Sequence, residues 1–187
     1  MEEEIQFYID SAKEQMEGAI VHTKAALNKL RAGKAMPNML DGLTVDYYGV
    51  ATPIGQASSI NTPDARTITI KPFEKSLIQE IEKAIINSDL GLNPQNDGES
   101  VIINIPPLSE ERRKILVKHA HAEAESGKVS IRNARKEANE SLKDLLKQSA
   151  SEDNVRDAEG EVQNLTNAFS KKIDDLLAAK EVEIMTV

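Results

Sequence analysis

The sequence predicts an α+β protein, in which a small β/α/β domain is inserted into a long three-helix bundle. Apolar residues recur at helical spacing over residues 2–30 and again over 108–187, and no proline interrupts the second segment. Between them the chain alternates as strands do and contains Gly and Pro turns. Only 3% of the 187 residues are aromatic, which favours cores of Leu, Ile, Val and Ala and helix-on-helix packing. We therefore expect a discontinuous bundle from residues 1–31 and 108–187, and an inserted domain from residues 32–107.

The first helix is expected over residues 2–30. Gly33 and Pro37 then interrupt its period, because both residue types disfavour a continuing helix. Its apolar stripe has charged residues between its members and is expected to consist of Ile5, Ile9, Ala12, Met16, Ala19, Thr23, Ala26 and Leu30.

The inserted domain is expected to hold strands and one helix. The strands are predicted at residues 43–48, 57–60, 66–71 and 101–105, with a break at Gly49 and Pro53, an end at residues 61–64, and a loop over 91–98. Residues 75–88 return to helical spacing. Tyr47 and Tyr48 in the first strand could form a stacking platform, but core and edge positions of a strand are the favoured interpretation.

Two further helices complete the predicted bundle. Pro106 and Pro107 close the inserted domain, and Ser109 can cap a helix over residues 110–147, about 57 Å long at 1.5 Å per residue. A turn and cap at 151–154 precede the last helix, which runs to about residue 183. Its expected stripe is Val155, Ala158, Val162, Leu165, Phe169, Ile173 and Leu176.

The 110–147 helix has an apolar stripe rich in small residues. Gly127 lowers helix propensity by about 1 kcal/mol relative to Ala. A close approach of a neighbouring helix would explain it, and a tolerated weak point is the alternative. The stripe consists of Leu116, Ala120, Ala124, Gly127, Ile131, Ala134, Ala138, Leu142 and Leu145.

A basic flank lies beside this stripe in an otherwise acidic protein. The net charge is −8, yet ten of the 23 Lys and Arg residues fall in residues 109–147, whose own balance is +3. Such a contrast indicates oriented contact with a polyanion, whereas a solvated face with ion pairs such as Glu125 beside Lys128 is the alternative. Arg132 and Arg135 are one turn apart and could hold adjacent phosphates. The flank consists of Lys114, Lys118, His121, Glu125, Lys128, Arg132, Arg135 and Asn139.

Signals for catalysis, metals and membranes are missing from the sequence. There is no cysteine, and His119 and His121 are two residues apart, so on a helix they cannot share a metal ion. No phosphate loop or hydrolase motif occurs. No apolar run approaches the roughly 20 residues that span a bilayer, and the N-terminus is acidic. We expect a cytoplasmic protein that is not an enzyme and needs no cofactor or metal.

Five segments, in order along nearly the whole chain, resemble signature segments of the ribosome recycling factor family. One departure is visible: the family motif after the first helix commonly reads Arg-x-Gly-Arg, and Lys34 stands at its last position, so the charge is kept without the bidentate fork. The matching segments are 30–35 (LRAGKA), 40–49 (LDGLTVDYYG), 88–94 (SDLGLNP), 105–114 (IPPLSEERRK) and 131–139 (IRNARKEAN).

The resemblance implies an L-shaped, tRNA-like molecule that binds the post-termination ribosome during protein biosynthesis. With elongation factor G and GTP hydrolysis by that partner, it would split the subunits and release mRNA and tRNA. We expect a monomer with no membrane contact and no small-molecule substrate. The alternative function is a helical protein-interaction module whose basic face binds an acidic protein.

The resemblance also assigns roles to individual residues. It implicates Arg113, Arg132 and Arg135 in contact with large-subunit ribosomal RNA, and Lys114, Lys118 and Lys128 extend the same basic surface. A flexible hinge is expected near residues 31–34 and 105–108. Its residues would be Arg31, Gly33, Lys34, Pro106 and Pro107.

Overall fold

The computed structural model describes residues 2–30 and 33–186. The chain divides into two compact units, Met1–Ala32 with Glu110–Val187, and Gly33–Ser109. We refer to them as the bundle and the inserted unit. The predicted fold class is confirmed, because three long helices form one unit and a sheet with a helix forms the other.

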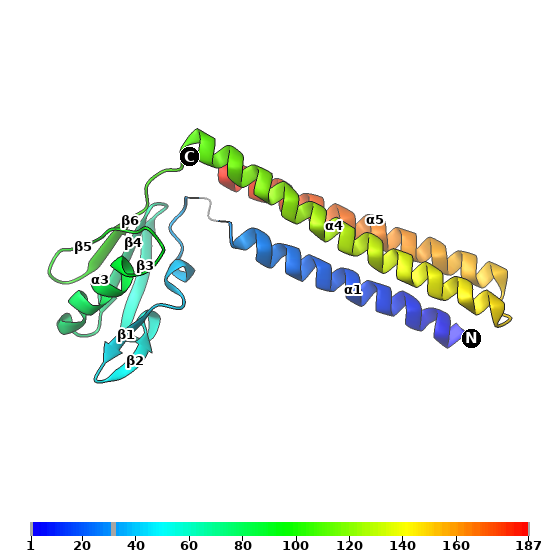
Figure 1. Ribbon diagram of the computed structural model, residues 1–187, viewed down its shortest axis with the longest axis horizontal. Coiled ribbons are helices and arrows are strands. Elements are labelled where there is room, and N and C mark those ends of the chain that lie inside the picture. The colour runs from blue at the N-terminus through cyan, green and yellow to red at the C-terminus, as the bar shows by residue number, and fades with distance from the viewer. Residues whose placement is uncertain (1, 31–32, 187) are drawn as a thin grey trace. The chain divides into compact units, whose positions relative to one another are not determined.

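The bundle consists of α1 (Glu2–Asn28), α4 (Glu110–Lys147) and α5 (Glu152–Met185), and each helix packs against the other two (Figure 1). The predicted stripe of α4 is confirmed residue for residue, since all nine positions are buried. Buried apolar side chains form one cluster around Ile9, Leu142 and Val162 and a second around Met16, Ile131 and Ile173. The core therefore extends along the helices instead of gathering at one point.

Gly127 lies at a close approach of α4 to the other two helices. A Cβ atom there would collide with the Thr23 side chain of α1 and lie 2.8 Å from Cδ1 of Ile173 of α5. Both contacts are shorter than a Cβ atom can make with a neighbouring side chain, so any larger residue at position 127 would push a helix away. Of the two explanations for this glycine, close helix packing is the one that the structure supports.

The ends of two stripes differ from the prediction. α1 ends at Asn28, and Leu27 is buried whereas Ala26 and Leu30 are only partly buried. The N–H of Leu30 bonds to the carbonyl of Leu27 at 3.1 Å, a tightened final turn that takes Leu30 off the helix face.

In α5 a threonine replaces the predicted leucine in the core. Thr166 is buried and Leu165 is only partly buried, as is Leu176. The Thr166 hydroxyl donates to the carbonyl of Val162 at 2.8 Å, so its polar group is satisfied inside the helix. An apolar-only pattern could not anticipate this choice.

The inserted unit contains a two-stranded hairpin and a four-stranded antiparallel sheet (Figure 1). The hairpin joins β1 (Thr44–Tyr47) to β2 (Val50–Pro53), and the sheet has the order β3-β4-β6-β5. The single core of this unit includes Val45 from the hairpin, Ile68 and Ile103 from the sheet, and Ile81 from α3. The remaining elements are a 3-10 turn η1 (Pro37–Leu40), α2 (Ile54–Ala57), β3 (Ser58–Asp64), β4 (Thr67–Pro72), a 3-10 turn η2 (Lys75–Leu77), α3 (Ile78–Ile86), β5 (Pro94–Asn96) and β6 (Val101–Asn104).

Two short strands and one strand end were predicted wrongly. β2 lies where a break was expected, β5 lies inside the expected 91–98 loop, and β3 continues to Asp64 with an irregular register. The exposed residues of β2 and β5 show no apolar alternation. Pairing through backbone groups leaves no trace in side-chain pattern, so edge strands of this kind escape a pattern-based prediction. The predicted 75–88 helix is also shorter, because its first turn is η2 and α3 ends at Ile86.

Candidate nucleic-acid interface

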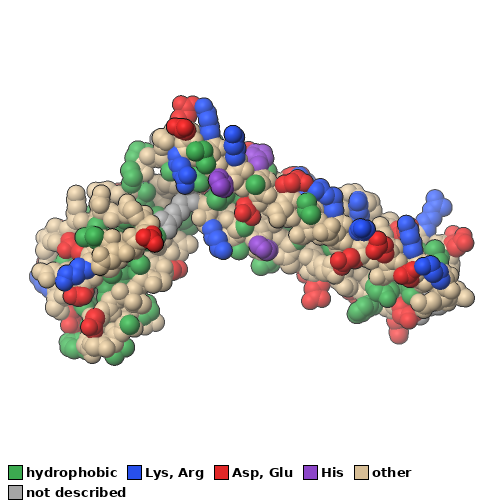
Figure 2. Space-filling model, viewed as in Figure 1, with side chains coloured by type: hydrophobic (Ala, Val, Ile, Leu, Met, Phe, Trp, Pro, Cys, Tyr) green, Lys and Arg blue, Asp and Glu red, His purple; other side chains and the backbone are tan. Residues whose placement is uncertain are grey.

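The basic flank is carried by a single uninterrupted helix. α4 runs for 38 residues, so side chains three and four positions apart remain aligned over its whole length. In Figure 2 Lys and Arg side chains line the edge of the bundle formed by α4, with Asp and Glu side chains among them. The sequence predicted an exposed flank, but the structure shows that its members are held in different ways.

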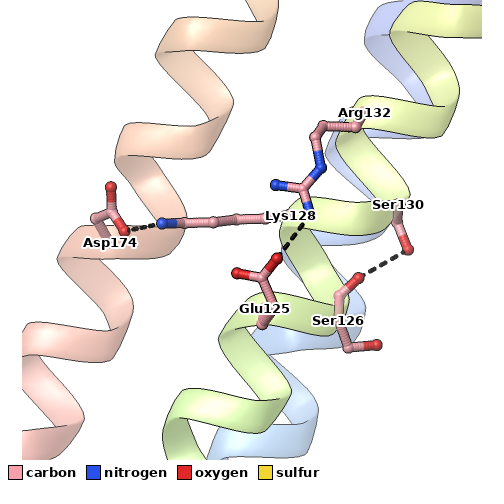
Figure 3. Close-up of polar contacts among 6 residues, drawn as sticks. All are labelled: Glu125, Ser126, Lys128, Ser130, Arg132 and Asp174. Carbon is pink, nitrogen blue, oxygen red and sulfur yellow. Dashed lines mark hydrogen bonds and ion pairs between the residues drawn. The ribbon is translucent and has the colours of Figure 1, made fainter.

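Two flank residues seven positions apart, His121 and Lys128, pair with residues of α5. Nζ of Lys128 lies 2.5 Å from Oδ1 of Asp174, and Figure 3 shows Lys128 reaching across from α4 to α5. One heptad earlier, His121 is paired with Glu181. The two contacts, seven residues apart on both antiparallel helices, define a polar seam between α4 and α5.

The seam continues one heptad further at Arg135. Its Nη1 donates to Oε1 of Gln163 at 3.2 Å, and Nε2 of Gln163 donates to Oδ1 of Asn167 at 2.9 Å. Lys128 and Arg135 are therefore partly buried and fixed by α5. Sequence reasoning missed these partners, although the matching seven-residue spacing of Asn167, Asp174 and Glu181 was a signal that could have revealed them.

Arg132 is held within α4 and projects from the seam. Its Nη2 donates to Oε1 of Glu125 at 2.6 Å, two turns earlier on the same helix (Figure 3). The Arg132 hydrogen bond lowers the pKa of the Glu125 carboxyl below its ordinary value, so Glu125 is ionised at neutral pH. The alternative interpretation of the flank offered Glu125 beside Lys128 as an ion pair, but Glu125 pairs with Arg132 and Lys128 pairs with Asp174.

The remaining residues predicted to contact RNA lie in the first turns of α4. Nζ of Lys114 lies 3.6 Å from Oε1 of Glu110, an exposed pair that contributes little to stability, and Lys118 is exposed. Arg113 is partly buried, and its Nε is buried without a hydrogen-bond partner among the described residues. The six predicted RNA contacts thus lie on one helix, but they do not form a uniform row of free cations.

The predicted hinge residues bracket the inserted unit, except that Arg31 lies outside the described residues. Gly33 has φ +73°, and a Cβ there would lie 2.9 Å from Cγ of Leu108, so only glycine fits without strain. Beyond it, the N–H of Ala35 donates to the carbonyl of Ala65 at 2.8 Å. On the return segment, after which Pro106 and Pro107 are exposed, the N–H of Ile105 donates to the carbonyl of Arg66 at 2.7 Å. Both segments are thus fixed to the β3–β4 turn.

The described part of the chain shows neither a metal site nor a membrane-spanning helix. No group of three or more His, Asp or Glu side chains there is arranged to hold a metal ion. No helix over residues 2–30 or 33–186 has the length and apolar character needed to span a bilayer. His22 and His119 are exposed, and His121 belongs to the polar seam.

The fold and the flank define a class of protein: a helical-bundle protein with an inserted α+β unit and a cationic helical surface suited to a polyanion. The model of the family described as ribosome recycling factor matches residues 23–185. The chain is 56% identical to the ribosome-recycling factor of Flavobacterium johnsoniae over 187 residues, covering 100% of both chains. It is 57% identical to that of Cytophaga hutchinsonii, covering 99% of this chain and 100% of the relative.

Solved structures give the same result. A solution structure of ribosome recycling factor matches with TM-score 0.77 and 35% identity over 98% of both chains. A second match has TM-score 0.63 and 42% identity over 97% of this chain and 99% of the other; it belongs to models of the Thermus thermophilus factor and Escherichia coli elongation factor G bound to the E. coli post-termination complex. The chain belongs to the ribosome recycling factor family.

Proposed function

We propose that this protein recycles ribosomes: it binds the post-termination ribosome and, with elongation factor G and GTP hydrolysis by that partner, separates the subunits so that mRNA and tRNA are released. The observation that carries the proposal is family membership over the full length of the chain. A solved relative at 42% identity is bound, with elongation factor G, to the post-termination complex. The alternative of a module for acidic proteins has no comparable support.

The basic flank is the surface proposed to contact large-subunit ribosomal RNA. Exposed Lys118 and Arg132 can reach phosphates directly, and the guanidinium of Arg132 can bind two phosphate oxygens at once. Arg135 is held by the neutral amide of Gln163, so it adds positive potential at a defined position with little further loss of side-chain freedom, whereas Asp174 compensates the charge of Lys128. Arg113 brings an unsatisfied donor to the start of the same helix.

Binding requires Arg132 to exchange partners. In the free protein its guanidinium holds the Glu125 carboxylate at 2.6 Å. A phosphate that approaches must replace or share this acceptor, and exposed ion pairs of this kind are worth only about 0–1 kcal/mol. The exchange is therefore inexpensive, and binding should weaken steeply as salt rises because several phosphates are neutralised.

The hinge is proposed to lie in the two segments that connect the bundle to the inserted unit. Backbone hydrogen bonds hold Ala35 and Ile105 to the β3–β4 turn, so we place the hinge between these two residues and the bundle helices. Gly33 supplies a conformation that other residues adopt with strain.

Subunit splitting with purified components tests the proposed function. Vacant or post-termination 70S ribosomes, elongation factor G and GTP are mixed with the protein, and light scattering follows dissociation. We expect splitting only when protein, elongation factor G and hydrolysable GTP are all present. Co-sedimentation with ribosomes should be strong at low salt and fall as salt rises. A protein that sediments with ribosomes but never accelerates splitting would contradict the proposal.

A further inference from the structure

A groove between α1 and α4 is left without a role by the RNA contact. It consists of two cavities, of about 270 Å³ and about 130 Å³, that share Gln15 and are lined by residues of these two helices. Figure 3 shows Ser130, which lines the larger cavity, and Lys128 of the polar seam pointing to different sides of α4. The larger cavity is lined by Gly18, His22 and Thr23 of α1 and by Glu123, Ser126 and Ser130 of α4, among others. We call the two cavities together the α1–α4 groove.

A glycine keeps this groove open on the α1 side. A glycine inside a helix lowers stability by about 1 kcal/mol relative to alanine. Close packing explains Gly127, whereas a Cβ atom at Gly18 would meet no atom within 4 Å. Gly18 is exposed and lines the larger cavity. The space above Gly18 is therefore not filled by the bundle itself.

A buried hydroxyl group faces the same space without a partner. Thr23 is 3% exposed and lines the larger cavity, yet its hydroxyl makes no hydrogen bond to any residue over 2–30 or 33–186. Buried Thr166 of α5, in contrast, donates to the carbonyl of Val162. An unsatisfied buried hydroxyl is costly, and a polar group that entered the groove would supply the missing partner.

The charges of the groove favour a cation. Glu123 lines the larger cavity and Glu137 the smaller one, and neither carboxylate pairs with another side chain in the described chain. Among the described residues no Lys or Arg lines either cavity. Two uncompensated carboxylates repel a phosphate backbone and attract basic side chains. The groove and the basic flank, which lie on different sides of α4, thus suit ligands of opposite charge.

The spacing of the two carboxylates matches an extended peptide. Glu123 and Glu137 are fourteen positions apart, or about 21 Å along α4 at 1.5 Å per residue. An extended chain rises about 3.3 Å per residue and covers this length in roughly six residues. Side chains six positions apart lie on the same side of an extended chain. Two basic residues at that spacing could therefore reach both carboxylates.

We infer that the α1–α4 groove binds an extended basic segment of a large-subunit protein, whose cationic side chains pair with Glu123 and Glu137 and which supplies a polar partner for Thr23. The inference rests on the proposed function, which brings the bundle to the large subunit. It assigns RNA to the basic flank of α4 and a protein segment to the groove on the other side of the same helix.

Neutralising the two carboxylates tests the inference by the sign of the effect. For a protein that meets only RNA, removal of negative charge leaves binding unchanged or strengthens it. Glu123→Gln combined with Glu137→Gln should instead weaken binding to purified large subunits about 5- to 10-fold at low salt. Glu3→Gln combined with Glu17→Gln is the charge-matched control, because both carboxylates are exposed on α1 and line neither cavity. Its affinity should not fall.

Filling the groove tests the role of its open space. Gly18→Gln places a long polar side chain over the larger cavity and should weaken large-subunit binding about 5-fold. Gly160→Gln is the matched control, since Gly160 is also exposed and also meets no atom within 4 Å of an added Cβ, but lines neither cavity. Both variants should melt at a higher temperature than the unmodified protein through helix propensity, so a loss of folding does not account for the expected difference in binding.

Crosslinking identifies what occupies the groove. The chain contains no cysteine, so a photo-crosslinker can be attached at one site in each of two variants, Ser126→Cys in the groove and Lys118→Cys on the flank. On bound large subunits the first should attach to a Lys- or Arg-containing segment of a protein and the second to ribosomal RNA, as mass spectrometry of the products would show.

Three results would overturn the inference. They are attachment of the Ser126→Cys probe only to RNA or to nothing, affinity of the Glu123 and Glu137 double variant equal to or above that of the unmodified protein, and equal losses for Gly18→Gln and Gly160→Gln. If the unmodified protein does not bind large subunits at all, it is the proposed function that fails.

Discussion

Five of the nine buried residues of α4 in the bundle are alanine or glycine, whereas eight of the fourteen buried core residues of the inserted unit are isoleucine. Small residues let the three helices approach closely, so each layer of the bundle buries little area and stability is spread along the helices. The inserted unit concentrates large branched side chains in one core. The bundle thus provides a long, straight surface for charges, and the inserted unit depends on a few residues for its integrity.

The largest expected effect is a loss of stability of the inserted unit alone. Ile103 on β6 is fully buried in the single core, so Ile103→Ala should destabilise that unit by about 2–5 kcal/mol. Because the bundle has separate cores, far-UV circular dichroism should retain most of the helical signal while amide exchange reports loss of protection in the sheet strands. Simultaneous loss of both units in one transition would show that they do not unfold separately.

The next effect concerns RNA contact, which we assign to the bundle only. Arg132→Ala combined with Arg135→Ala should leave folding intact and weaken large-subunit binding roughly 100-fold, since each phosphate contact by an arginine is worth on the order of 1–2 kcal/mol. Binding to purified large subunits at several salt concentrations measures the loss, and the salt dependence should become shallower.

A matched pair of cations in the inserted unit provides the control. Arg66 and Lys71 are both exposed, and replacing them by alanine removes the same charge from the other unit. The affinity for large subunits should change by less than about twofold, as expected when exposed charges are removed away from the interface. Equal losses for the two double variants would mean that net charge, and not the basic flank, determines RNA affinity.

Close packing of the bundle is tested at its glycines. Gly127→Ala should destabilise the bundle by about 1–3 kcal/mol because the added methyl group collides with Thr23 and Ile173. A Cβ atom added at Gly160 of α5 would meet no atom within 4 Å, so Gly160→Ala should stabilise the bundle by about 0.5–1 kcal/mol through helix propensity. Urea unfolding of both variants gives the comparison, and a stabilised Gly127→Ala protein would contradict the close approach.

The smallest effect concerns the polar seam. Asp174→Asn removes the charge that holds Lys128, and the lysine becomes available to phosphate without a competing carboxylate. We expect large-subunit affinity to rise about two- to threefold, within the range of exposed ion pairs. Reduced affinity would show that Asp174 assists binding by orienting Lys128 instead of competing for it.

Much of the candidate interface could be predicted because it lies on one helix. Arg113, Lys118 and Arg132 were identified from spacing and resemblance, and the structure places them on α4 with the apolar stripe turned away. The partners of Lys128 and Arg135 could not be derived in the same way. They come from α5, and only the rotation and register of two helices against each other decide which residues meet.

The sequence by itself determined the helical faces, the two-unit organisation of the fold class and the family of this protein. These properties depend on periodicities of 3.6 and 2 residues that the local backbone imposes, and on motifs that are contiguous in the chain. The tertiary structure decided the edge strands β2 and β5, the burial of Leu27 and Thr166, and the bond from Arg132 to Glu125 in place of Lys128. In each case the alternative local conformations or contacts are similar in free energy, and packing against residues distant in sequence determines which one forms.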